Sequence, residues 1–185
     1  MMFNDVFNFE NLYNSYLKSR KGKRNKNTAI KYETNAIEAT NYLLYQLLND
    51  KYKVSEYKKF YVYEPKKRLI MSLPFKDRVV QHCLCDYYLE PTLEKALIYD
   101  NYASRKGKGT HKGLYRLGEY MHKQYRKNGI DGYVLKCDIS KYFYSIDHEV
   151  LKCLLSKYIL DDKILSLTFK IIDSTEGNVG LPIGN

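Results

Sequence analysis

Residues 133 to 140, Tyr-Val-Leu-Lys-Cys-Asp-Ile-Ser, alternate between two kinds of side chain, and this alternation limits the possible folds more than any other stretch. A period of two is typical of a β-strand with one packed face and one open face. Asp138 then stands on the open face of a strand that is supported from behind. The packed face would consist of Tyr133, Leu135, Cys137 and Ile139.

Asp138 allows two interpretations. A carboxylate that a rigid strand holds in place is a good ligand for magnesium, which prefers hard oxygen donors. A solvated aspartate at the end of a strand is an equally good interpretation of this residue alone. Phe143 lies five positions further on. Its ring either flanks a bound substrate or begins the next helix as a core residue.

The rest of the periodicity is mostly helical. Asn8 can cap the first helix, and Ser145 or Asp147 can cap the helix that follows Phe143. Pro91 is expected to end the helix before it, because proline lacks an N–H group. Apolar spacings of three and four predict helices over 9–20, 28–49, 76–90, 110–125, 147–159 and 161–174.

A β-hairpin is predicted between the second and third of these helices. Aromatic and branched runs at 60–63 and 69–73 lie on either side of a Glu-Pro pair and a basic tip. Helices combined with antiparallel strands indicate the α+β class.

The charge of the chain favours an anionic partner. The 31 Lys+Arg residues against 21 Asp+Glu give a formal charge of +10. That excess favours a polyanion, nucleic acid before membrane. An A/T-rich genome is the alternative explanation, since it would enrich lysine codons and also account for the 20 tyrosines.

The cysteines and the apolar runs exclude other classes. The four cysteines, at 83, 85, 137 and 153, have no CxxC spacing and no histidine at the spacing of a metal ligand, which argues against zinc and for reduced thiols. No apolar run approaches the about 20 residues of a membrane span. The N-terminus lacks the features of a signal peptide. We therefore expect a cytoplasmic protein without a membrane partner.

The stretch from 138 to 148 reads Asp-Ile-Ser-Lys-Tyr-Phe-Tyr-Ser-Ile-Asp-His. It resembles palm motif A of the reverse transcriptases, often D-I-x-x-F-F-x-S-I-x-H in the bacterial enzymes of group II introns and diversity-generating retroelements. The resemblance implies that Asp138 and the backbone carbonyl of Ile139 hold two catalytic Mg²⁺ ions. It also implies that Phe143 packs under the incoming sugar, where a 2′-hydroxyl would clash.

Two upstream stretches are similar to further motifs of this family. Residues 66–81 follow the fingers pattern K-x-R-x-[IL]…P…D-R-[IV]-V-Q, which implies that Lys66 and Arg68 grip the triphosphate. Two such residues share a face of a strand, although a solvated hairpin tip is the alternative without the family. Residues 102–113 match the basic, Gly-rich loop in which Arg105 is implied to contact nucleotide or template.

A third stretch, 180–185, looks like the start of the motif G-x-P-Q-G. Pro182, Ile183 and Gly184 are thereby implied to line the nucleotide site. Ile183 stands where most members have glutamine. Members with an aliphatic residue there cluster with the diversity-generating retroelements, in which the exchange is associated with relaxed copying fidelity.

The resemblance covers about 60–185 and implies the fingers and a partial palm of a right-hand polymerase. It divides the chain into a helical N-terminal extension with a basic segment (1–55), fingers with a β-hairpin (56–130) and an incomplete antiparallel palm sheet with packed helices (131–185). The residues best suited to contact an RNA backbone are Lys18, Arg20, Lys21, Lys23, Arg24 and Lys26.

The implied function is RNA-directed DNA synthesis by nucleotidyl transfer with two Mg²⁺ ions. Its partners would be an RNA template, a DNA or RNA primer and dNTPs, with a structured intron or retroelement RNA as a further possibility. The Y-x-D-D motif, which carries the other metal carboxylates, would follow residue 185. We therefore interpret the chain as an N-terminal fragment and expect it to be inactive alone.

Two alternatives remain open. The chain can be a non-catalytic RNA-binding module of an intron splicing cofactor or a retroelement ribonucleoprotein. A metal-dependent nuclease is less favoured, because no second acidic residue stands at a matched strand end.

Overall fold

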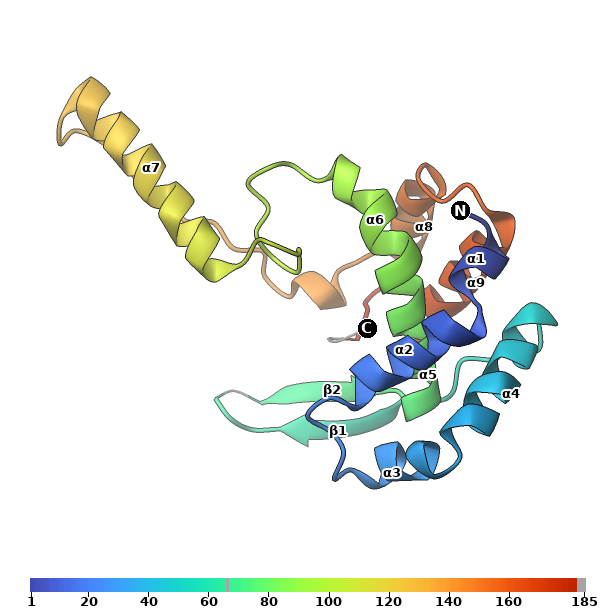
Figure 1. The fold of residues 1–185 in the computed structure, drawn as a ribbon. Helices are drawn as coiled ribbons and strands as arrows, with labels where there is room; N and C mark the ends of the chain where they lie inside the picture. The colour runs from blue at the N-terminus through green and yellow to red at the C-terminus, as the bar shows by residue number, and fades with distance from the viewer. Residues whose placement is uncertain (66, 183–185) are drawn as a thin grey trace. The chain divides into compact units, whose positions relative to one another are not determined.

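The computed structural model describes residues 1–65 and 67–182. Helices dominate and one antiparallel sheet has two strands, so the expected α+β class is confirmed (Figure 1). No helix in this described part is long and apolar enough to cross a bilayer. The α-helices are α1 (Phe3–Val6), α2 (Phe9–Arg20), α3 (Asn27–Thr34), α4 (Ala36–Leu48), α5 (Phe75–Leu84), α6 (Glu90–Leu93), α7 (Thr110–Asn128), α8 (His148–Ser156) and α9 (Asp162–Ile172). The strands are β1 (Lys58–Val62) and β2 (Arg68–Ser72), and shorter turns are η1 (Cys85–Leu89), η2 (Glu94–Ala96) and η3 (Tyr142–Tyr144).

The chain forms two compact units. The first consists of residues 1–93 and the chain from 141 onward, and the second consists of 94–140. These bounds differ from the division at residues 55 and 130 that the resemblance implies. The reason is that the helices before residue 55 share one hydrophobic core with α5 and α9 instead of forming a layer of their own.

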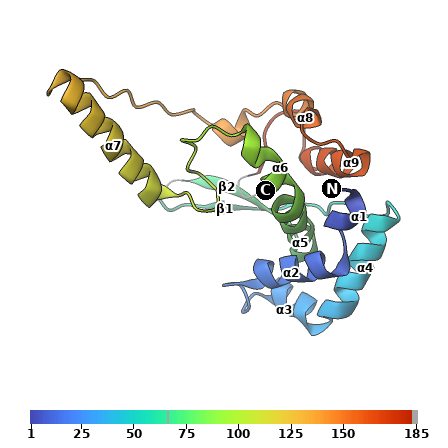
Figure 2. The same cartoon turned by 45° about the horizontal axis from the view of Figure 1, so that its top comes forward.

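Contacts between aromatic rings connect the helices in the hydrophobic core of the first unit. α2 packs against α5 (Figure 2). The ring of Tyr16 on α2 lies 5.3 Å from Tyr32 on α3 and 6.2 Å from Phe75 on α5, measured between centroids. Tilted ring pairs at such distances add to the stabilisation that burial provides.

Most of the expected helices form. α2 has the predicted bounds, and Asn8 Oδ1 accepts the Asn11 N–H at 2.9 Å as its cap. Asp147 caps α8 in the same way, through the Val150 N–H at 2.9 Å. The helix expected over 28–49 is in fact two, because Asn35 leaves the helical region at φ −128° and ψ 44°. Thr34 and Asn35, which lie at the break, are weak helix formers.

The expectation that Pro91 ends the third helix is wrong. α5 continues through the π-helical turn η1 into α6, which contains Pro91 (Figure 1). The N–H of Glu90 bonds to the carbonyl of Cys85, five residues back. This wider turn shifts the hydrogen-bond pattern just before Pro91. The missing N–H of the proline therefore does not interrupt the continuous helix made of α5, η1 and α6.

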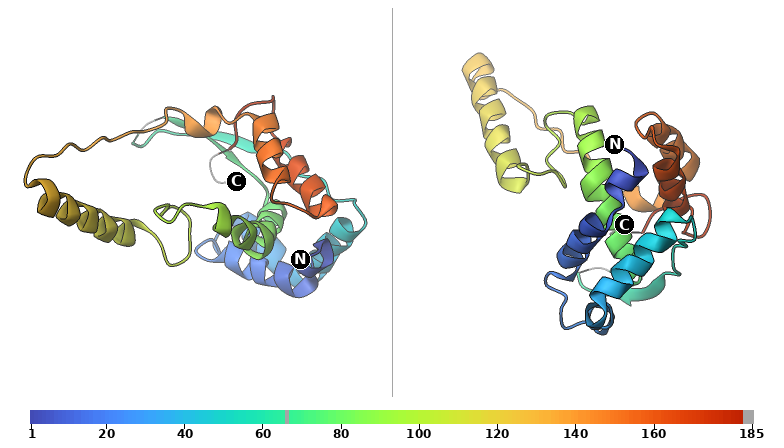
Figure 3. Two further views of the ribbon diagram at one scale, coloured as in Figure 1. Left: turned by 90° about the horizontal axis from the view of Figure 1, so that it is seen from above. Right: turned by 45° about the vertical axis from the view of Figure 1, so that its right-hand side comes forward.

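The hairpin is confirmed, whereas the strand expected over 133–139 is not formed. β1 and β2 pair antiparallel with Phe60 opposite Ile70. Residues 131–139 are exposed and have neither helix nor strand (Figure 3). A strand requires a neighbour for its N–H and C=O groups, and no described residue pairs with this segment. The incomplete palm sheet is therefore absent from the described part of the chain.

Candidate functional site

The segment 178–181 lies antiparallel to residues 143–148. Leu181 N donates to the Phe143 carbonyl at 2.7 Å, and Gly180 N donates to the Ile146 carbonyl at 2.7 Å. His148 N donates to the Asn178 carbonyl at 3.0 Å. Two stretches that are far apart in the sequence thus become neighbours.

The side chain of His148 stabilises the contact between residues 143–148 and 178–181. Its side chain is only 2% exposed, and Nε2 lies 2.8 Å from the Gly180 carbonyl oxygen. On the other side of the ring, Nδ1 lies 3.7 Å from a carboxylate oxygen of Asp173. The Thr175 hydroxyl also donates to the Gly180 carbonyl, at 3.4 Å. The structural role that the sequence indicated for the start of α8 extends to holding the 178–181 segment.

Glycine is favoured at position 180, where the two segments approach most closely. Its φ is +97°, in the region that favours glycine. A Cβ atom at this position would lie 3.3 Å from the Tyr144 carbonyl oxygen. Both the backbone conformation and the tight space therefore disfavour a side chain at this position.

A cavity of about 200 Å³ opens between this segment and the hairpin. Leu69 and Met71 of β2 form one wall, and Gly180 to Pro182 form another. Lys59 of β1 lies at the cavity, where its ammonium donates to Glu176 at 2.8 Å and lowers the pKa of that carboxyl. The cavity therefore offers apolar walls with an ion pair at its edge, in which Glu176 compensates the charge of Lys59.

Arg68 does not face this cavity. Side chains alternate along a strand, and Leu69 and Met71 line the cavity from β2. Arg68 therefore stands on the opposite face of the hairpin, and Lys59 is the basic residue that faces inward. Lys66 lies outside the described residues. The sequence offered no signal for Lys59, because two adjacent lysines begin the strand and neither is marked as the one that faces the cavity.

Pro182 and Phe143 are the two expected nucleotide-site residues that the structure brings together. Pro182 lines the cavity, and the Phe143 carbonyl accepts a hydrogen bond from the N–H of Leu181, the residue before Pro182. The Phe143 side chain is exposed and belongs to the turn η3. Ile183 and Gly184 lie outside the described residues.

Arg105, Asp138 and Ile139 belong to the second unit. Arg105 is engaged within its own loop: its Nε and Nη2 donate to the Glu94 carboxylate at 3.1 and 2.5 Å. Its Nη1 donates to the carbonyls of Ile98 and Asn101 at 2.8 and 3.0 Å. With a side chain only 9% exposed, Arg105 holds the loop together instead of presenting a free guanidinium.

Asp138 and Ile139 lie in the exposed coil that replaces the expected strand. Within 1–65 and 67–182, no three His, Cys, Asp or Glu residues gather closely enough to hold a metal ion. Of the two-magnesium site that the resemblance implies, the described residues thus supply Asp138 and the Ile139 carbonyl, without a cluster of further carboxylates around them.

The basic segment divides into two kinds of residue. Lys18 pairs with Asp86 at 2.6 Å, and Arg20 pairs with Glu33, so both charges are largely compensated. Lys21 and Arg24 are exposed in the connection between α2 and α3. Lys23 is partly buried there and Lys26, the last of the six, is exposed.

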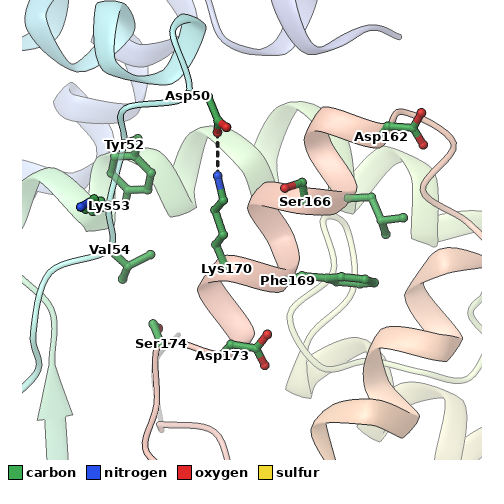
Figure 4. A pocket seen from close by; sticks show the side chains of 11 residues that line it. Asp50, Tyr52, Lys53, Val54, Asp162, Ser166, Phe169, Lys170, Asp173 and Ser174 are labelled. Atoms are coloured by element: carbon green, nitrogen blue, oxygen red, sulfur yellow. Dashed lines mark hydrogen bonds and ion pairs between the residues drawn. The ribbon is translucent and has the colours of Figure 1, made fainter.

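A larger groove of about 740 Å³ separates residues 50–54 from α9 (Figure 4). Lys170 reaches across it and donates to Asp50 at 2.6 Å. This contact lowers the pKa of the Asp50 carboxyl. Because the charges of both signs on its walls compensate one another, the groove has no clear preference for a ligand.

A scan of the sequence against protein-family models found no match, and a search of the curated proteins found none either.

Proposed function

We propose that this chain supplies the template-holding and nucleotide-holding parts of an RNA-directed DNA polymerase. The observation that carries the proposal is the 2.7 Å hydrogen bond between Leu181 N and the Phe143 carbonyl. The resemblance assigns Phe143 and Pro182 to one nucleotide, and such residues have to be neighbours. A cavity bounded by Pro182 and the hairpin residue Lys59 adds support.

Magnesium enters this proposal through Asp138 and the Ile139 carbonyl, together with further carboxylates. Such ions would supply activation of the primer 3′-oxygen and stabilisation of the leaving pyrophosphate. What this chain contributes is position and charge: an apolar cavity with the Lys59–Glu176 ion pair at its edge, and the exposed basic connection between α2 and α3.

The first test asks whether the chain alone polymerises. Incubation of the purified chain with an RNA template, a DNA primer, dNTPs and Mg²⁺ is expected to give no extended primer on a sequencing gel, because one carboxylate cannot organise two ions. The Asp138→Ala variant serves as the control. Extension by the wild-type chain that disappears in this variant would contradict the expected inactivity.

The second test addresses RNA binding. Lys21 and Arg24 are exposed, so they are free to meet phosphates. Replacing both with glutamine should flatten the slope of log K against log salt by roughly 1.4, at about 0.7 for each lost contact with single-stranded RNA. Fluorescence anisotropy with a labelled RNA oligonucleotide measures this slope.

Lys157→Gln is the matched control for the loss of an exposed charge, because Lys157 follows α8 at a distance in sequence from the basic segment. It should leave the slope unchanged. If the double variant behaves like this control, Lys21 and Arg24 do not contact RNA.

RNA binding without catalysis is also what a splicing cofactor or ribonucleoprotein module would show. This alternative is favoured by the position of Asp138, which lies in exposed coil and not on a strand. Testing Asp138→Ala within a longer protein that carries these motifs separates the two. A polymerase loses activity, and a binding module has none to lose.

A further inference from the structure

Two side chains of α5 carry buried donors that have no acceptor. Arg78 and Gln81 are three residues apart, so they project from the same face of the helix. Arg78 Nε and Gln81 Nε2 are both buried, and neither has a hydrogen-bond partner within the described residues. Buried donors are nearly always paired in native proteins, so these two nitrogens are exceptions that a bound acceptor would satisfy.

Positive charge collects around these donors. Arg78 stacks over the Phe75 ring, with Cζ 5.7 Å from the ring centroid, and forms no ion pair among residues 1–65 and 67–182. Lys23 has a lowered pKa because of burial, and the nearby charges of Arg78 and Lys26 lower it further. Like charges held together in this way favour a bound anion.

The neighbouring carboxyl groups of Asp86 and Asp77 already accept hydrogen bonds from other residues. Both oxygens of Asp86 accept from the Lys18 ammonium, at 2.6 and 2.7 Å. Asp77 precedes Arg78 and projects from a different face of α5, where it accepts the hydroxyl of Tyr52 at 2.7 Å. The positive charge on the Arg78 face therefore has no counterpart in this part of the protein.

We propose that Lys23, Lys26, Arg78 and Gln81 form a binding site for a phosphate group of a nucleic-acid backbone. The guanidinium and the amide offer directed N–H groups to the phosphate oxygens, and the two lysines act as mobile point charges. The exposed Lys21 and Arg24 lie in the same connection and extend the positive surface to neighbouring phosphates. The nucleic-acid source of the phosphate rests on the proposed function, whereas the preference for an oxyanion does not.

The test uses the 185-residue chain and a fluorescein-labelled single-stranded RNA, with anisotropy followed as a function of KCl. Arg78→Gln should weaken binding roughly tenfold at about 0.1 M salt and flatten the salt slope by about 0.7. Lys157→Gln, which removes an exposed charge elsewhere, should change neither quantity. Far-ultraviolet circular dichroism checks that each variant is folded.

A second variant protects the test against misfolding of the first. If Arg78→Gln fails to fold, Lys23→Gln combined with Lys26→Gln changes only residues outside the helices' buried faces and should flatten the slope by about 1.4. Wild-type binding that none of these substitutions alters would overturn the site and leave the proposed function standing.

Inorganic phosphate distinguishes the two sources of the anion. If the wild-type chain does not bind RNA, the proposed function and the nucleic-acid source both fail. A rise in melting temperature with millimolar phosphate, seen in the wild type and absent in Arg78→Gln, would then assign the site to free phosphate. No rise in either protein would refute the oxyanion site altogether.

Discussion

Replacing His148 with alanine is expected to lower the free energy of unfolding by about 3 kcal/mol. The imidazole is almost fully buried, and its Nε2 lies 2.8 Å from the Gly180 carbonyl oxygen. Alanine would leave a cavity and weaken the pairing of that carbonyl, and each of these changes costs stability. Urea unfolding followed by circular dichroism measures the loss.

The control for this substitution is His122→Ala, because His122 is exposed on α7 and the change of side chain is identical. It should alter stability by no more than about 0.5 kcal/mol. In His148→Ala, the amides of Gly180 and Leu181 should also exchange hydrogen faster, since His148 fastens their segment. Unchanged exchange at these two amides would show that His148 does not hold the segment.

Replacing Tyr52 with phenylalanine is expected to cost about 2 kcal/mol. The Tyr52 hydroxyl donates to Asp77 Oδ1 at 2.7 Å, and Asp77 is fully buried. Oδ2 of this carboxylate has no partner in the described part of the chain, and the Ser55 N–H reaches Oδ1 only at 3.4 Å. The substitution therefore removes the closest hydrogen-bond donor of a buried carboxyl group.

Labelling of Cys83 offers a sensitive measurement of this loss. Burial raises the pKa of the Cys83 thiol to about 12, so it reacts only when the core opens. In a variant whose other cysteines are serine, Tyr52→Phe should speed labelling roughly thirtyfold, the equivalent of about 2 kcal/mol. Tyr42→Phe, at an exposed position on α4, should leave the rate unchanged. Equal rates in the two variants would mean that the Tyr52 hydroxyl contributes little to stability.

Sequence patterns predicted the elements whose causes are local. α2 and α8 follow from apolar spacing and capping residues, and the hairpin follows from two branched runs around a breaker. The break at Asn35 and the π-helical turn before Pro91 depend on small shifts in backbone geometry. Apolar periodicity does not encode such shifts, so these details were missed.

The contacts of the candidate site were harder to predict, because they join distant stretches. Alternation at 133–139 indicated a strand, but whether a strand forms depends on a partner that the alternation does not specify. Arg105 matched a motif, yet its donors are used by Glu94 and by carbonyls of its own loop. The role of Gly180 depends on where Tyr144 lies, which only the folded chain reveals.

The loop around Arg105 is stabilised by contacts among its own residues and with α7. Glu94 and Arg105 close it, Asp100 accepts the hydroxyls of Tyr102 and Tyr120 at 2.8 and 2.5 Å, and Lys108 sits over the Tyr99 ring. All these partners lie within residues 94–120. Because these contacts are local in the sequence, we expect the loop to keep its conformation when residues outside 94–120 are substituted.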